Sequence, residues 1–256
     1  LLLTVILLYR NYKFHKTKST KTIDEDSLSE AEGSSVQGVI HESAKNISKV
    51  VKRTNKIYSN TIDGLAKQEL SLLKKSKNQV VKLSDEIDDL RDNITYFIKN
   101  LDASSLQASG FYINILGYLQ DMSQSLEYIS KISYRHINNN HKQLKSGQIK
   151  ERKEIVDKLE VLFSDIEKAF KSESFEEIGV ILNEKKMVYN LLNEKIEKQI
   201  ERTRSEESSP KNTTLHFGLL LETKDLVDAT MNLLEEYHNS FDSSIEPATI
   251  SVSKEN

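Results

Sequence analysis

Apolar residues recur at alternating steps of three and four along most of this chain, and that spacing constrains the fold more than any other feature. The clearest run comprises Val80, Leu83, Ile87, Leu90, Ile94, Phe97 and Leu101. Such steps place every side chain on one face of an α-helix. Gly occurs eight times and Pro twice, so few residues interrupt helices. No stretch has the pattern of a strand, and the sequence therefore predicts an all-α protein.

Breaks between the apolar stripes predict six helices, over residues 34–60, 63–101, 103–145, 148–171, 175–205 and 210–241. Residues suited to starting or ending helices lie at these breaks: Ser209–Pro210, Ser174 with Glu177, Asp102, Asn60–Thr61 with Gly64, and Gly147. Short connections between long amphipathic helices make neighbouring helices antiparallel.

The N-terminal segment has the character of a membrane helix that ends near Tyr9. Leu1–Leu8 is apolar except for Thr4, and a basic cluster follows before Asp24. Eight residues are too few to span a bilayer, so we interpret residues 1–12 as the end of a transmembrane helix. The alternative is a short apolar helix of a soluble protein. Residues 13–35 are rich in Ser, Thr and charge, which predicts a flexible linker.

Composition and motifs exclude several classes of function. The net charge is −3, whereas nucleic-acid binders carry a basic excess, so we predict no nucleic-acid partner. The chain contains no Cys, which excludes disulfides and thiolate zinc sites. It contains no Walker-type loop, HExxH motif or nucleophile elbow. We therefore do not expect an enzyme.

The third and sixth predicted helices share a spacing of polar residues. When YLQDMSQSLEYI is aligned with LLETKDLVDATM, polar residues three apart coincide. Asp121 then aligns with Glu222, Gln124 with Asp225, and Glu127 with Asp228. This internal similarity favours two three-helix units over a single six-helix bundle. We place the units at residues 36–145 and 146–242, and a disordered tail at 243–256.

Longer phrases resemble known proteins of phosphate uptake. YLQDMSQSLEYISKISY, residues 118–134, is similar to a helix of the PhoU family of phosphate-uptake regulators. Residues 100–144 and 202–237 are more similar still to the cytoplasmic C-terminal region of bacterial PiT-type inorganic phosphate transporters. The resemblance implies a PhoU-like tandem of two three-helix bundles. It also implies that a permease precedes Leu1.

The resemblance further implies a cytoplasmic regulatory or assembly domain for cation-coupled phosphate symport. The expected partners are inorganic phosphate, a coupling cation (sodium or proton), the chain's own permease domain and the membrane at the N-terminal segment. The expected location is the inner membrane, with residues 13–256 on its cytoplasmic side. A homodimer, a helical signalling region of a receptor or sensor kinase, and a structural interaction module all stay open.

Metal ligands and histidines offer weaker signals. PhoU proteins bind metal clusters through acidic motifs, but here Gln120 and Gln124 occupy the positions of the Glu and the Asp. A carboxamide is a poorer ligand for a hard cation than a carboxylate. We therefore interpret these residues as a solvated face and predict no metal or cofactor. The weak metal candidates are Asp121, Glu222 and Asp225.

His136 and His141 lie five residues apart. Metal-binding histidines on one helix face are usually four residues apart, so this spacing does not predict a metal site. We expect them to have ordinary surface or partly buried roles. The segment INNNH at 137–141 is consistent with a fraying helix end, a polar contact or a partner site. The other isolated histidines are His41, His216 and His238.

Overall fold

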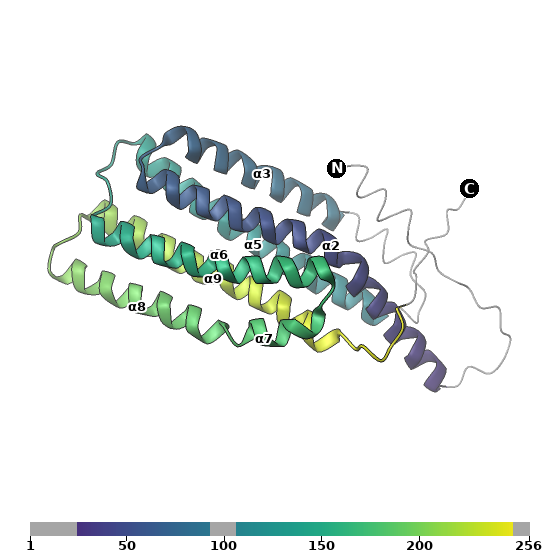
Figure 1. Cartoon of the computed structure of the whole chain (residues 1–256). Helices are drawn as coiled ribbons and strands as arrows, with labels where there is room; N and C mark the ends of the chain where they lie inside the picture. The colour runs from purple at the N-terminus through teal and green to yellow at the C-terminus, as the bar shows by residue number, and fades with distance from the viewer. Residues whose placement is uncertain (1–24, 93–105, 248–256) are drawn as a thin grey trace.

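The computed structural model describes residues 25–92 and 106–247, and all regular structure in these ranges is helical. Six long helices lie side by side (Figure 1): α2 (Glu25–Ala66), α3 (Leu70–Asp92), α5 (Leu106–Asn138), α6 (Ser146–Ser172), α8 (Lys185–Arg204) and α9 (Pro210–Ser240). A 3-10 turn, η2 (Phe175–Glu177), and the short α7 (Ile178–Leu182) join α6 to α8. The prediction of an all-α fold with six long helices is confirmed.

For description, we group the six long helices as a first set, α2, α3 and α5, and a second set, α6, α8 and α9. Helices α2, α3 and α5 contact one another, and α8 contacts both α6 and α9. The two sets meet where α2 packs on α6 and α5 packs on α9. The connections α2–α3, α5–α6 and α8–α9 lie together at the left of Figure 1, and we call this region the loop end. Helix α2 begins and α9 ends at the opposite end of the bundle.

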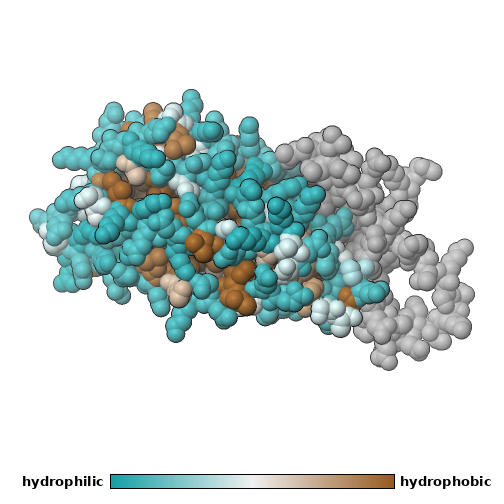
Figure 2. Space-filling view, in the orientation of Figure 1, coloured by the Kyte–Doolittle hydropathy of each residue, from teal (hydrophilic) through white to brown (hydrophobic). Residues whose placement is uncertain are grey.

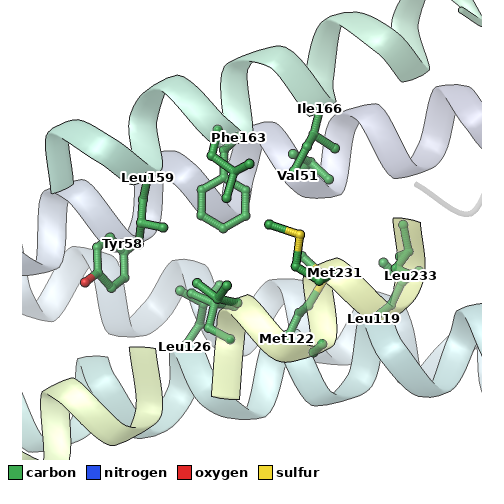
Figure 3. Packing of buried hydrophobic residues seen from close by; sticks show 14 of the residues in the cluster. Val51, Tyr58, Leu119, Met122, Leu126, Leu159, Phe163, Ile166, Met231 and Leu233 are labelled. Atoms are coloured by element: carbon green, nitrogen blue, oxygen red, sulfur yellow. The ribbon is translucent and has the colours of Figure 1, made fainter. Parts of the chain in front are cut away.

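One continuous hydrophobic core joins the two sets. Figure 3 shows side chains of four helices meeting in it, among them Val51, Tyr58, Leu119, Met122, Leu126, Phe163, Ile166 and Met231. Phe163 and Ile166 are 0% exposed, and burying such a side chain contributes about 1.5–3 kcal/mol. The surface in Figure 2 is largely hydrophilic, with small separate apolar patches. Ile200 continues the apolar spacing of the predicted helix 175–205, yet its side chain is 45% exposed and lies outside the core.

The predicted break near residue 62 was wrong, because α2 continues to Ala66. Gly64 lies within the helix, where it lets α3 approach closely. A Cβ atom at this position would lie 3.0 Å from Leu73 Cγ. The chain leaves α2 at Gln68, whose φ is 56°, and Glu69 N donates to Gly64 O over 2.8 Å. This is the hydrogen bond of a Schellman motif.

Helix α5 also ends in a Schellman motif. It stops at Asn138, not at the predicted 145, and Gly147 lies in the first turn of α6 instead of ending α5. Asn140 has a φ of 54°. The amide of His141 donates to His136 O over 3.1 Å. Asn accepts this left-handed conformation more readily than most residues because its short polar side chain bonds locally.

Two predicted N-caps can be compared with the structure. The cap at Ser209 is confirmed, since Asn212 N donates to Ser209 Oγ over 3.3 Å and Pro210 occupies the first turn. The capping box at Ser174 is wrong. Its side chain makes no cap hydrogen bond and lies 2.9 Å from Ser172 Oγ instead. The predicted helix 175–205 is also interrupted, with Asn183 and Glu184 between α7 and α8.

Helix α2 begins at Glu25, so residues 25–35 of the predicted linker are helical. The rest of the linker, the predicted membrane segment 1–12, the Asp102 cap and residues 248–256 of the predicted tail lie outside the described residues. Among the helices that the structure describes, none is both long and apolar enough to cross a membrane.

Hydrogen bonds fix the end of the bundle opposite the loop end. Gln37 Nε2 donates to Ser240 O over 2.7 Å, and Asp242 N donates to Gln37 Oε1 over 3.2 Å. The ring of Tyr237 packs edge-on against Phe170, with 4.7 Å between the centroids. These contacts hold the end of α9 against α2 and α6.

Candidate functional site

The three weak metal candidates lie on α5 and α9, one of the two pairs of helices that join the sets. Asp121 and Asp225 are exposed, and Glu222 is half-buried. Burial raises the pKa of the Glu222 carboxyl, and the charge of Asp225 raises it further, against a hydrogen bond with Ser125. Glu222 and Asp225 therefore interact with each other.

Asp121 has different neighbours. The pKa of Tyr118 is raised mainly by burial, and also by the charges of Glu236, Glu235 and Asp121. These three carboxylates therefore share one polar region around the ring. In the part of the chain that the structure describes, no group of three His, Cys, Asp or Glu side chains is arranged to hold a metal ion. Asp121 therefore lies in the polar region around Tyr118, whereas Glu222 and Asp225 interact with each other on α9.

A buried ionic network crosses the second set of helices. Glu151 on α6 accepts two hydrogen bonds from Arg202 on α8, one of them 3.0 Å long between Arg202 Nη1 and Glu151 Oε2. His216 Nε2 on α9 lies 3.5 Å from the same Oε2. Burial raises the pKa of Glu151, but the hydrogen bonds with His216 and Arg202 outweigh it and lower this pKa to about 2. The carboxylate is therefore charged.

Arg152, the next residue, is 1% exposed. Its Nη2 lies 3.4 Å from both His216 Nε2 and His216 O, and the Tyr58 side chain interacts with the same guanidinium. Burial lowers the pKa of Arg152 to about 10. Burial, together with the charge of Arg152, lowers the pKa of His216 to about 4 against its hydrogen bond with Glu151. His216 is consequently neutral at pH 7.

A surface pocket of about 300 Å³ lies at the loop end, between the last turns of α5 and the first turns of α9. Its lining combines an apolar side with a basic one: Tyr128, Ile132 and Leu215 with Arg135, His136, His141 and Lys211, and the polar Asn139 and Thr214. No Asp or Glu lines it. The pocket also lies beside the N-terminus of α9, where the helix dipole presents partial positive charge.

The two histidines of the pocket lie against each other, with 5.2 Å between the ring centroids. The Schellman motif at Asn140 reverses the chain after α5 and returns His141 to His136. Burial lowers the pKa of His136, and the charge of His141 lowers it further, against a hydrogen bond with the Lys142 carbonyl. His136 Nε2 donates this bond over 2.9 Å, so Nδ1 is the ring nitrogen that remains for a ligand.

The α5–α6 connection that forms one wall of the pocket is held from two sides. Gln143 Nε2 donates to Ala66 O at the end of α2 over 2.9 Å, and Asn212 Nδ2 of α9 donates to Gln143 O over 2.9 Å. The connection also carries Leu144, which is buried in the core. The wall of the pocket is therefore preformed.

Sequence reasoning missed this pocket. It treated His136 and His141 as separate because it placed both within one helix, and it assigned no role to Arg135, Tyr128 or Lys211. The available signal was the INNNH segment, whose asparagines favour a left-handed helix end. The backbone hydrogen bonds of this segment form an ordered turn, so the helix end does not fray.

Comparisons with known proteins identify the fold. No protein-family model and no curated protein sequence matches the chain. Among solved structures, the chain is similar to the crystal structure of the phosphate transport system regulatory protein PhoU from Streptococcus pneumoniae. The TM-score is 0.61 at 14% sequence identity, and the match covers 78% of this chain and 94% of that one. The six-helix body described above therefore has a PhoU-like fold.

Proposed function

We propose that this chain is a non-enzymatic regulatory module of phosphate uptake. It acts on the cytoplasmic side of the inner membrane, attached to a PiT-type permease through its N-terminal segment. The permease carries out cation-coupled phosphate symport, and the helical body modulates it. The observation that carries the proposal is the PhoU-like fold over most of the chain, because the solved neighbour is itself a phosphate transport regulator.

The order of segments supports this proposal. An apolar stretch and a basic cluster precede the helical body in the sequence, as expected where a membrane helix ends on the cytoplasmic side. A permeation path needs polar groups inside membrane spans. The described helices are not of that kind, so the proposed role of this body is to bias the permease by binding two of its states unequally.

The test is phosphate uptake into membrane vesicles by the full-length transporter and by a version truncated after residue 24, at matched membrane abundance. Truncation is expected to change the rate, the affinity or the response to external phosphate, and to leave transport intact. A Lys168→Ala version serves as the control, because this α6 side chain is 72% exposed and its loss is expected to leave uptake unchanged.

Two results would contradict the proposal. Identical uptake with and without the body would reduce it to a scaffold. Complete loss of uptake, with normal insertion in the membrane, would make the body part of the transport machinery. A gene that encodes no polytopic membrane sequence upstream of Leu1 would remove the permease attachment from the proposal and leave the regulatory role to be tested against separate transporters.

A further inference from the structure

The pocket at the loop end has a charge and a shape that the proposed regulatory role does not explain. Four basic side chains line it, two of which, Arg135 and Lys211, carry full positive charges at neutral pH. They come from two different helices and face a space without any lining carboxylate. Cations placed together in this way repel one another unless an anion lies between them.

We propose that this pocket binds a small anion that carries phosphate groups. Arg135 matches a phosphate because its guanidinium offers several donors in a fixed plane. Lys211 adds a second charge from the first turn of α9, where the helix dipole also favours an anion. The turn that carries His141 is fixed to α2 and α9 by hydrogen bonds, so this wall of the pocket is in place before the ligand arrives.

The size and the apolar side of the pocket restrict the choice of ligand further. A volume of about 300 Å³ is at the lower end of small-molecule sites, and it exceeds what one phosphate fills. The Tyr128 ring and the Ile132 and Leu215 side chains form the apolar side. The shared chemistry is thus a phosphate chain, which either pyrophosphate or a nucleoside diphosphate supplies; with the nucleotide, Tyr128 would contact the base.

A metal ion fits the pocket less well. Two imidazoles lie within reach of each other, but no carboxylate or thiolate lines the pocket to complete a coordination shell. The charges of Arg135 and Lys211 also oppose a divalent cation. Anion binding at this pocket is independent of the proposed role in transport, and the two can therefore fail separately.

The experiment is calorimetric titration of the full 256-residue chain with inorganic phosphate, pyrophosphate and ADP at near-physiological salt. Pyrophosphate is expected to bind with one ion per chain and more tightly than phosphate. Arg135→Ala and Lys211→Ala are each expected to weaken this binding about tenfold or more, the usual loss for a hydrogen bond to a charged group. Lys131→Ala is the matched control, because it removes a charge one turn earlier on α5, outside the lining, and should change affinity less than about twofold.

A second readout separates site binding from general attraction of anions. Bound phosphate raises the pKa values of nearby imidazoles, so pyrophosphate should move the NMR titrations of His136 and His141 to higher pH. The charged groups that line the same pocket as these rings are Arg135 on α5 and Lys211 on α9. Tighter binding of ADP than pyrophosphate, lost in Tyr128→Ala, would support the proposal and identify a nucleotide as the source.

The proposal is overturned if none of the three compounds binds at millimolar concentration. It is equally overturned if Lys131→Ala weakens binding as much as Arg135→Ala, since attraction would then be a property of the surface and not of the pocket. Zinc that binds to the chain and is lost in His136→Ala and His141→Ala, with no phosphate compound binding, would assign the pocket to a metal and refute it.

Discussion

The buried imidazole of His216 should make the stability of the protein depend on pH. The side chain is 0% exposed and faces Glu151 Oε2 at 3.5 Å and Arg152 Nη2 at 3.4 Å. Burial, with the charge of Arg152, lowers its pKa from 6.5 to about 4. As the pH falls below 6.5, the unfolded chain takes up a proton that the folded chain refuses until about pH 4. The contribution to stability is therefore complete above pH 6.5 and lost as the pH falls to 4.

The size of the effect follows from that interval. One proton bound only by the unfolded state changes the free energy of unfolding by about 1.4 kcal/mol per pH unit. Between the unfolded pKa of 6.5 and the folded pKa of about 4, the loss amounts to about 3.4 kcal/mol. Glu151, whose pKa is lowered to about 2, adds its own loss only below about pH 4.5.

The assay is urea denaturation followed by circular dichroism at several pH values from 8 to 4, on the native chain and on His216→Gln. The free energy of unfolding of the variant must be subtracted from that of the native chain, because the carboxyl of Glu42 changes stability with pH in the opposite direction to His216. Burial raises the pKa of Glu42 to about 7, so that carboxyl favours the folded state as the pH falls. Subtracting the two curves cancels Glu42, which is present in both.

The native chain is expected to lose stability relative to His216→Gln as the pH falls, by about 3.4 kcal/mol over the whole range. A difference that stays flat within about 0.5 kcal/mol would refute the burial argument, because His216 would then titrate alike in both states. A difference of the opposite sign would show that Glu151 holds the ring in its charged form.

Four further substitutions test the packing and the helix ends, three of them through the free energy of unfolding in urea and Glu206→Gly through the thermal midpoint of unfolding. Phe163→Ala should lower it by about 3–5 kcal/mol, because the ring is fully buried between the two sets of helices; a loss below about 1 kcal/mol would contradict that location. Gly64→Ala should lower stability, since its Cβ would lie 3.0 Å from Leu73 Cγ, whereas Gly117→Ala, with open space around it, should gain up to about 1 kcal/mol. Equal effects at the two glycines would refute the close contact. Glu206→Gly should raise the thermal midpoint, because it relieves a φ of 55°, and a lower midpoint would count against strain there.

The helices and their buried faces could be predicted because both depend on nearby residues. Val156, Leu159 and Phe163 follow one another at helical spacing, and all are buried as expected. The local signal fails where burial is set by a neighbouring helix. Ile200 continues its stripe in the sequence, yet it is 45% exposed.

The helix ends were harder to predict because they are formed by residues that do not usually mark the end of a helix. Gln68, Asn140, Glu173 and Glu206 all have positive φ, and no described glycine does. The sequence therefore misplaced the ends at Gly64 and Gly147. Tertiary contacts account for the difference at Gly64, since α3 packs against that glycine and keeps it inside the helix.

The candidate site could not be predicted in full because its parts meet only in three dimensions. His136 and His141 approach each other through the turn at Asn140, and Lys211 reaches the same pocket from α9, far along the chain. The acidic positions are the opposite case. Asp121, Glu222 and Asp225 were found from their spacing, and the structure places them on a polar face without joining them into one cluster.

Helix α9 begins beside the pocket and ends at Ser240, whose carbonyl accepts from Gln37. Its 31 residues form a rigid rod of about 46 Å. One continuous helix therefore connects the pocket at the loop end with the hydrogen bond to Gln37 of α2 at the opposite end of the bundle.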